Sequence, residues 1–510
     1  MNDTAKTVTA LLARGAPDRT ALSAPGAPPL TYAALRLLVS DTIGSLRERG
    51  IGAGDRVAIV LNNGPAMATA FLCVAGGATA APLNPAYRAE EFEFYLTDLR
   101  ARLLVVEKDA ESPAVDVATR LAIPIARLVT RPERGAGSFS LEFPPGGTAP
   151  AAAEWRQSLP DDVALVLHTS GTTSRPKIVP LTQRNICASA HAIRVRLALG
   201  EADVGLCIMP LFHIHGLIAA LLAPLSAGGE VLCAPGFNAL KFFSWMEEAR
   251  PTWYTGVPTM HQAILKRAAN NARTIAANRL RFVRSSSSSM PLRVIGELER
   301  TFGAPVIEAY GMTEAAHQIA SNPLPPDLRK PGTVGQGAGP EVRVANECGE
   351  SVPPGMSGEI VIRGDSVMSA YENNPAANAD AFIDGWFRTG DLGTMDADGY
   401  VTITGRLKEV INRGGEKISP REVDEVMMGH PAVHQCVCFA IPHDMLGEEV
   451  AAAVVLREGV QASDKELRRY ASGRLADFKV PRTIVVVPEI PVGPTGKLQR
   501  IGLAQKLGLA

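Results

Sequence analysis

The stretch Leu165-Val-Leu-His-Thr-Ser-Gly-Thr-Thr-Ser-Arg-Pro-Lys-Ile-Val-Pro180 decides the expected fold, because an apolar run typical of a buried strand ends in hydroxyls, one glycine and a lysine. Such a loop offers many hydrogen-bond donors to anionic oxygens and predicts a polyphosphate site. It is not a Walker loop, since no second glycine precedes Lys177 and Ile178 follows it. The simpler alternative is a surface loop rich in serine and threonine.

The bulk composition is that of a soluble globular protein with two or more domains. The chain has 510 residues, of which 46% are hydrophobic and 20% charged. A net charge of -1 argues against a nucleic-acid partner, and no apolar run is long enough to span a bilayer. The first residues lack a basic segment followed by an apolar one, so we expect no signal peptide and a cytoplasmic location.

Seven cysteines are scattered along the chain. Cys436 and Cys438 would share one face of a strand, and they form no metal-ligand pattern with another pair. We therefore expect reduced, structural thiols.

The order of apolar segments predicts an α/β fold in two domains. Strand-like runs alternate with longer helical patterns, which favours parallel strands, at residues 56–61, 102–107, 163–167 and 229–234. Alternating runs at 341–345 and 358–363, with Gly and Pro turns, indicate a small β-subdomain. We expect an N-terminal domain over 1–405 and a small α+β domain over 406–510, with a helix that begins after Ser463.

Five motifs carry the chemistry, and they occur in a fixed order. They are the 169–177 loop, Pro210-Leu-Phe-His-Ile-His-Gly216, Glu308-Ala-Tyr-Gly-Met-Thr-Glu314, Trp386-Phe-Arg-Thr-Gly-Asp391 with Gly405-Arg-Leu-Lys-Glu-Val-Ile-Asn-Arg-Gly-Gly-Glu-Lys417, and Gly493-Pro-Thr-Gly-Lys-Leu-Gln-Arg500. Together they resemble the adenylate-forming superfamily of acyl-CoA synthetases, aryl-CoA ligases, luciferases and peptide-synthetase adenylation domains. The resemblance covers essentially the whole chain.

The resemblance implies a large N-terminal domain of layered α/β subdomains, a small β-subdomain and a small mobile C-terminal domain. It also implies a two-step reaction with ATP, coenzyme A, a small carboxylic acid and Mg²⁺. A carboxylate first attacks the α-phosphate of ATP, which releases pyrophosphate, and the thiol of coenzyme A then attacks the acyl-adenylate. Because the first step sets two anions against each other, the site must neutralise charge and hold them in line.

The nucleotide-binding residues follow from the same resemblance. Glu314 is the expected Mg²⁺ ligand, since a hard cation that bridges phosphates prefers a carboxylate. Asp391 is expected to accept hydrogen bonds from the ribose hydroxyls, with help from Arg406. The remaining expected contacts to ATP are Thr169, Ser170, Gly171, Thr172, Thr173 and Lys177 at the β,γ-phosphates, Thr313 at the α-phosphate, Glu308 and Ala309, and Tyr310 against the adenine.

The C-terminal domain is expected to change position between the two steps. Lys497 matches the mobile lysine that stabilises the adenylation transition state with an ammonium charge. Lys408 occupies the hinge position. Gly414 and Gly415 would let the backbone approach the pantetheine of coenzyme A, as residues without Cβ can. The alternative for the hinge segment is an exposed charged linker.

The acyl pocket is expected to hold a small polar acid with a second anionic group. His213, Ser289 and His317 fall at pocket positions of the superfamily. The segment from Glu308 to Pro325 most resembles oxalyl-CoA synthetases, which makes oxalate the expected acid. Ser174 is shared with that group, but Ile178 departs from the superfamily's glycine and predicts a less mobile end of the phosphate loop.

Three alternatives keep part of this interpretation. A different acid, such as malonate, another short acid or a hydroxycinnamate, would keep the chemistry. An adenylation module would load a carrier protein, although no carrier-like segment follows up to Ala510. A binding protein with a decayed site is disfavoured because Lys177, Glu314, Asp391, Arg406 and Lys497 are all present. A lone histidine can also be an ordinary core residue.

Overall fold

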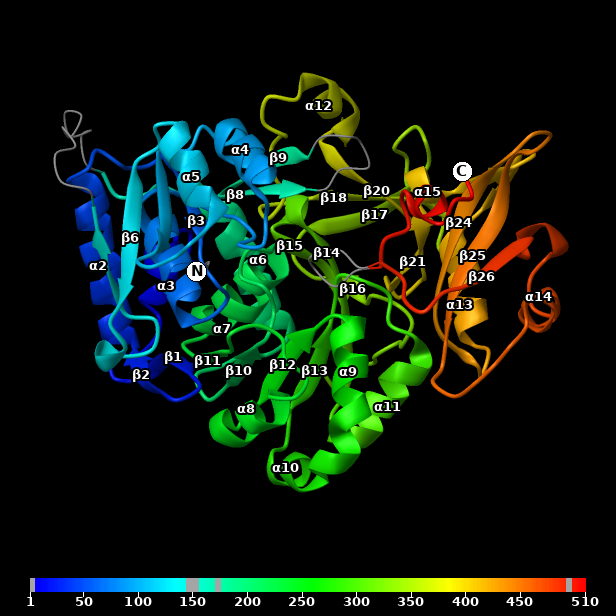
Figure 1. Ribbon diagram of the computed structural model, residues 1–510, viewed down its shortest axis with the longest axis horizontal. Helices are drawn as coiled ribbons and strands as arrows, with labels where there is room; N and C mark the ends of the chain where they lie inside the picture. Colours follow the sequence, from blue (N-terminus) through cyan, green and yellow to red (C-terminus); the bar gives the residue numbers. More distant parts are fainter. Residues whose placement is uncertain (1–4, 144–155, 170–175, 492–497) are drawn as a thin grey trace.

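The structure is a computed structural model that describes residues 5–143, 156–169, 176–491 and 498–510. Within these residues the chain forms four β-sheets surrounded by helices (Figure 1). The two largest sheets lie in the N-terminal part, a five-stranded sheet follows them, and the last sheet forms the orange and red end of the molecule. The predicted α/β architecture is therefore confirmed. No helix of the described residues is both long and apolar enough to cross a membrane.

The seven-stranded sheet has at one edge the hairpin strands that flank the expected phosphate loop. Its core strands are parallel because helical crossovers join them, and its last pair is an antiparallel hairpin. In spatial order the strands are β7 (Phe139–Glu142), β6 (Ile125–Thr130), β5 (Leu103–Glu107), β3 (Arg56–Val60), β4 (Thr79–Pro82), β8 (Val163–Thr169) and β9 (Lys177–Thr182). The expected strands at 56–61, 102–107 and 163–167 are thus present.

The nine-stranded sheet contains β15, which begins at His317, one of the residues expected in the acyl pocket. Its central strands are parallel, and β14 then turns back into the antiparallel β15. The spatial order is β16 (Gln336–Gly337), β15 (His317–Ser321), β14 (Val306–Met312), β13 (Phe282–Ser285), β12 (Trp253–Gly256), β10 (Val204–Cys207), β11 (Glu230–Cys233), β1 (Thr20–Ala24) and β2 (Ala27–Thr31).

Two helices join these sheets into one core. The helix α3 (Pro65–Gly77) contacts strands of both sheets and is buried along nearly its whole length, as its run of small and apolar residues requires. The helix α6 (Gln183–Arg196) contacts β8, β9 and β15. Because each helix touches both sheets, the phosphate hairpin and the acyl strands are held in fixed relation.

Two smaller sheets complete the fold. The β-subdomain contains β17 (Glu341–Ala345), β18 (Gly358–Arg363), β19 (Phe382–Ile383), β20 (Trp386–Met395) and β21 (Val401–Arg406). The C-terminal sheet contains β22 (Ile411–Arg413), β23 (Glu416–Ile418), β24 (Val433–His443), β25 (Gly447–Leu456) and β26 (Thr483–Val486). The helix α14 (Asp464–Ser472) begins after Ser463, whose side chain caps it, as expected.

The strand β24 shows why the C-terminal sheet has a core on each face. Cys436 and Cys438 lie in one buried cluster with the helix α13 (Pro420–Met428), whereas Val437 and Phe439 lie in a second cluster. This alternation follows from the two-residue period of a strand. All seven cysteines are free and six are buried, which agrees with the expected structural thiols.

A π-helical segment, η2 (His215–Leu222), ends in the core beside β15 and depends on a single glycine. A Cβ built on Gly216 would lie 2.2 Å from the carbonyl oxygen of Pro210. The backbone there cannot move away from this oxygen, because Leu217 donates its N–H to His213 O at 3.1 Å within the same tight turn. Only glycine therefore allows the turn that presents His215 to β13 and β15.

Gly216→Ala should lower the free energy of unfolding by roughly 2–4 kcal/mol, because the added methyl group overlaps a backbone oxygen. The matched control is Gly44→Ala within the helix α2 (Tyr32–Arg47), where no atom lies within 4 Å of the added Cβ. The control should be neutral or stabilising by about 0.5–1 kcal/mol. Urea unfolding of both variants measures the difference, and equal midpoints would contradict the packing argument.

Candidate active site

The phosphate hairpin places its two ends opposite each other. Thr169 ends β8 and Lys177 begins β9, and the two residues are register partners in the antiparallel pair. Ser170, Gly171, Thr172 and Thr173 lie outside the described residues, so their expected phosphate contacts stay predictions. Ile178 is 3% exposed and packs in an apolar cluster, and its carbonyl accepts the N–H of Glu372 at 3.1 Å.

A tyrosine links the phosphate hairpin to the expected metal ligand. Glu314 lies in the 3₁₀ turn η4 (Thr313–Ala315), is buried, and accepts a hydrogen bond from the Tyr371 hydroxyl at 2.9 Å. The Lys177 Nζ lies 4.3 Å from the centre of the Tyr371 ring, a cation–π contact. Burial raises the pKa of Glu314, and burial together with the charge of Lys408 lowers the pKa of Lys177. The three side chains therefore form one weakly solvated group.

A second polar group joins β14 to the β-subdomain. The Tyr310 hydroxyl donates to Asp391 Oδ2, and the Arg406 Nε lies 2.6 Å from Asp391 Oδ1. Asp391 and Arg406 are register partners on β20 and β21. The charge of Asp391 raises the pKa of Arg406, and burial followed by the same carboxylate raises the pKa of Tyr310. Asp391 is thus a fixed, buried acceptor beside β14, as a ribose ligand needs to be.

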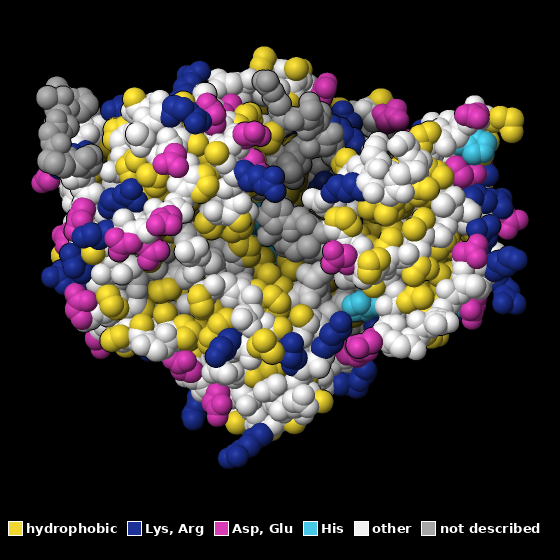
Figure 2. Space-filling model, in the orientation of Figure 1, with side chains coloured by type: hydrophobic (Ala, Val, Ile, Leu, Met, Phe, Trp, Pro, Cys, Tyr) yellow, Lys and Arg dark blue, Asp and Glu magenta, His cyan; other side chains and the backbone are white. Residues whose placement is uncertain are grey.

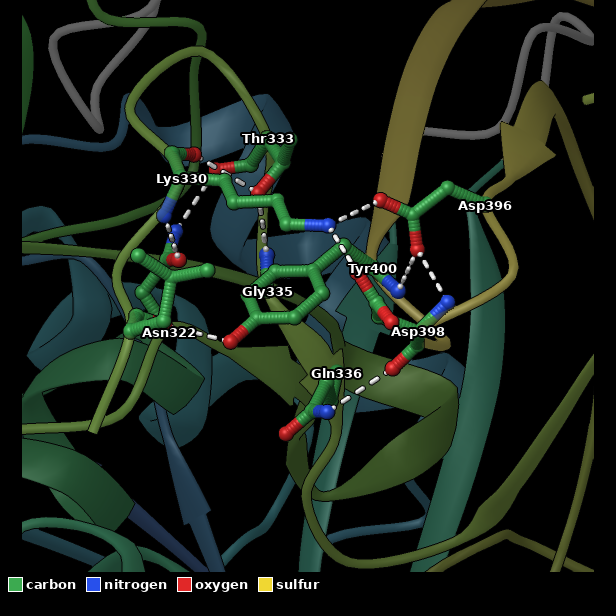
Figure 3. A network of polar contacts seen from close by, with 9 residues as sticks. Asn322, Lys330, Thr333, Gly335, Gln336, Asp396, Asp398 and Tyr400 are labelled. Carbon is green, nitrogen blue, oxygen red and sulfur yellow. Dashed lines mark hydrogen bonds and ion pairs between the residues drawn. The ribbon is translucent and has the colours of Figure 1, made fainter.

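The segment between β15 and β16 braces this arrangement (Figure 3). Lys330 forms ion pairs with Asp396 at 2.6 Å and Asp398 at 2.7 Å, both in the turn that joins β20 to β21. Its backbone N–H donates to Asn322 Oδ1 at 3.0 Å, next to the end of β15. These contacts hold the hairpin that carries Asp391 against the strand pair that carries Tyr310.

Glu308 contacts the same segment between β15 and β16. Its carboxylate accepts the N–H of Gly332 at 2.9 Å, and burial raises its pKa to about 7. The neighbouring Ala309 accepts a hydrogen bond from Ser286 Oγ at 2.9 Å through its carbonyl. Thr313 opens the turn that carries Glu314 and is half-buried.

The acyl side of the site is built around two stacked imidazoles. His317 begins β15 and His215 begins η2, and their ring centres lie 4.7 Å apart with planes 19° apart. The buried Arg284, on β13, donates to both rings, at 3.3 Å to His215 Nε2 and 3.2 Å to His317 Nε2. His317 has φ +97°, a strained backbone for a side chain, and such strain is concentrated at functional sites.

Of the other expected acyl residues, His213 lies beside His215. His213 is half-buried, and its Nδ1 is 3.5 Å from the backbone N of His215. Ser289 is half-buried beyond the end of β13. Sequence reasoning missed His215, although it stands within the motif at residues 210–216, and it also missed Arg284. It missed Tyr371 altogether, because a single tyrosine in a loop gives no signal.

The residues expected at the hinge and beside coenzyme A lie shortly after β21. Lys408 is exposed in η5 (Leu407–Glu409), directly after β21. Gly414 and Gly415 form the turn between β22 and β23 with φ of +59° and +99°, which glycine adopts without strain. Lys497 lies outside the described residues. The expected role of each stays a prediction.

The charged side chains on the visible face bear on the expectation that the protein has no nucleic-acid partner. On the face drawn in Figure 2, acidic and basic side chains are interspersed rather than gathered by sign. Nucleic-acid binding requires a basic stripe or patch. Among its described residues, the face drawn in Figure 2 shows no such stripe or patch.

Glu308 provides a pH test of the site. Its pKa rises from 4.5 in the unfolded chain to about 7 in the folded protein, so the folded state binds the proton more tightly. Stability from this group is complete below pH 4.5 and is lost as the pH rises through about 7, by roughly 3 kcal/mol. Chemical unfolding at pH 5 and pH 8 should show this loss in the wild type and not in Glu308→Gln. Parallel pH profiles for the two proteins would contradict the assignment.

Comparison with known proteins identifies the family. The AMP-binding enzyme family matches residues 11–372, and the C-terminal domain of AMP-binding enzymes matches residues 422–497. The chain is 46% identical over 500 residues to an oxalate–CoA ligase of Arabidopsis thaliana, covering 97% of this chain and 96% of that protein. It is 39% identical over 477 residues to an oxalate–CoA ligase of Saccharomyces cerevisiae, covering 88% and 86%. The ATP-bound crystal structure of MatB from Rhodopseudomonas palustris has a TM-score of 0.87 at 29% identity, covering 98% of each chain. The resemblance drawn from the five motifs is confirmed, and the chain belongs to the AMP-binding enzyme family.

Proposed function

We propose that this protein is an ATP-dependent oxalate–CoA ligase. It joins oxalate to the α-phosphate of ATP, releases pyrophosphate, and transfers the oxalyl group of oxalyl-AMP to coenzyme A with release of AMP. The observation that carries the proposal is the arrangement around β14. Glu314 follows it and Tyr310 on it donates to Asp391, while Arg284 on the neighbouring β13 donates to His215 and His317. A nucleotide site and a small cationic acyl site thus meet at one strand.

The nucleotide half has groups for each part of ATP. Asp391 is a buried acceptor for the ribose hydroxyls, oriented by Arg406 and Tyr310. Lys177 is placed for the β,γ-phosphates at the mouth of the hairpin, and its contact with Tyr371 holds the ammonium group over a ring face. Lys177 therefore offers a preformed cation to the phosphates and Asp391 a preformed acceptor to the ribose, as positioning catalysis requires.

Mg²⁺ fits this site as an ion held mainly by the nucleotide. The described residues contain no cluster of three His, Cys, Asp or Glu side chains that could hold a metal alone. They do contain Glu314, whose buried carboxylate is held by Tyr371 and has a raised pKa that a bound cation would reverse. One carboxylate is enough, because Mg²⁺ in such sites keeps waters and substrate phosphates as its other ligands. When bound, the ion neutralises charge on the phosphates.

The second step needs a different arrangement of the C-terminal domain. We place its boundary after residue 405, with Lys408 as hinge, Gly414 and Gly415 beside the pantetheine, and Lys497 in the adenylation state. The exposed Lys408, between β21 and β22, is a site where a backbone rotation meets little packing resistance. We also place the protein in the cytoplasm, where its free cysteines would stay reduced.

Oxalate should be the preferred acid in an assay of AMP release that contains ATP, Mg²⁺ and coenzyme A. The panel is oxalate, malonate, acetate and coumarate, and we expect kcat/KM for oxalate to exceed that for acetate by about 100-fold or more, because a buried polar site rejects a ligand that leaves its groups unpaired. Coenzyme A is the only acceptor added, so turnover also excludes a requirement for a carrier protein. A rate with coumarate and none with oxalate would show that the substrate assignment is wrong.

Lys497→Ala should separate the two steps. Adenylation, measured by pyrophosphate exchange, should fall by about 100-fold or more, because an ammonium group that stabilises the transition state is lost. Formation of oxalyl-CoA from preformed oxalyl-AMP should be largely retained. Lys465→Ala, an exposed lysine on α14 of the same domain, is the control and should leave both steps unchanged. Equal loss of both steps in Lys497→Ala would argue against domain alternation.

A further inference from the structure

Arg284 is a buried cation without an acidic partner. Its side chain is fully buried on β13, and among the described residues no carboxylate forms an ion pair with it. Its Nε also has no hydrogen-bond partner. Burial lowers its pKa to about 9, so the guanidinium stays charged at neutral pH.

The contrast with Arg281, three residues earlier, shows how unusual this is. Arg281 is partly exposed and donates two hydrogen bonds to the buried carboxylate of Asp203. A buried charge without a partner costs several kcal/mol. The chain therefore maintains a destabilising group at Arg284, although the fold supplies a carboxylate partner to the nearby Arg281. Such a group is expected where function, rather than stability, requires it.

Arg284 also fixes the protonation of the two imidazoles. A guanidinium can only donate hydrogen bonds, so the His215 and His317 Nε2 atoms that face it must accept. Both rings are then neutral and carry their hydrogen on Nδ1. His215 Nε2 also accepts from Thr255 Oγ1 at 2.7 Å, which agrees with this tautomer. The two stacked rings are thereby held as Nδ1 donors.

The same tautomer assigns a role to Ser287. His215 Nδ1 lies 3.1 Å from Ser287 Oγ, and the ring must be the donor in this hydrogen bond. The hydroxyl hydrogen of Ser287 is then left to donate elsewhere. Ser287 is half-buried and has φ +74°. Its backbone is therefore strained just beyond the end of β13. An acceptor that is negatively charged suits this end of the pocket.

We propose that Arg284 sets the charge specificity of the acyl pocket, and that its missing counter-ion is the second carboxylate of a dianionic substrate held by the Ser287 hydroxyl, which His215 orients. Arg284 acts through His215, His317 and its electrostatic field, so it is a positioning residue rather than a catalytic one. The inference rests on the proposed function for the identity of the acid as oxalate. It goes further in naming the group that rejects acids with a single charge.

The test compares oxalate with oxamate, which has the same shape but an amide in place of the second carboxylate. Adenylation is measured by pyrophosphate exchange for the wild type, Arg284→Met, Arg284→Lys and the control Arg281→Met. In Arg284→Met the ratio of kcat/KM for oxalate to that for oxamate should fall by about 100-fold, mostly through KM for oxalate. Arg284→Lys keeps the charge and should restore part of the ratio. Arg281→Met should leave the ratio unchanged.

The outcomes separate this inference from the proposed function. If Arg284→Met lowers kcat/KM for both acids equally, or changes neither value, Arg284 does not set charge specificity. If Arg284→Met fails to fold, the neutral variant Arg284→Gln is measured in its place, and a wild-type ratio in that variant overturns the inference. If the wild type ignores oxalate but adenylates another dianionic acid, such as sulfoacetate, the proposed function is wrong and selective loss of that acid in Arg284→Met supports the inference. A wild type that prefers oxamate overturns both.

Discussion

The close approach of two backbones at Gly311 and His317 fixes the geometry on which the site depends. A Cβ on Gly311 would lie 1.7 Å from the carbonyl oxygen of His317, so β15 can turn back against β14 only because position 311 is glycine. The turn between them contains Glu314 and then enters the left-handed region at Ala316 and His317. A carboxylate for the nucleotide side and an imidazole for the acyl side are thus set by one strained turn, with little freedom to move relative to each other.

The sequence predicted elements whose signals are local. Periodicity located the strands at 341–345 and 358–363, and a serine followed by glutamate located the start of α14 at Ser463. The order of five motifs predicted the family, because each motif keeps residues that one chemistry requires. Ile178 was interpreted through loop mobility, whereas the structure places it in a strand without a positive φ, where it fills an apolar cluster. The isoleucine is explained by packing within β9.

Residues whose role depends on long-range contacts could not be predicted in this way. Tyr371 reaches Glu314 across 57 positions, and Arg284 reaches His215 across 69. The five serines that follow Arg284 in the chain do not reveal that it lacks, within the described part of the molecule, the acidic partner that Arg281 has. The difference appears only when β13 is packed against η2 and β15, since burial then removes water and the nearest polar partners prove to be neutral. The domain boundary, the phosphate-loop hydroxyls and Lys497 stay predictions from the motifs.

The two halves of the site have different charge balances, and this difference bears on how an acid would bind productively. On the nucleotide side Lys177 and Arg406 are matched by Glu314 and Asp391, so this side attracts a carboxylate weakly before ATP and its metal are present. On the acyl side Arg284 is unmatched. An acid with one carboxylate would be drawn to the imidazoles beneath Arg284 and would then have no nucleophile to direct at the α-phosphate. A dicarboxylate satisfies the buried cation with one group and still presents the other for attack.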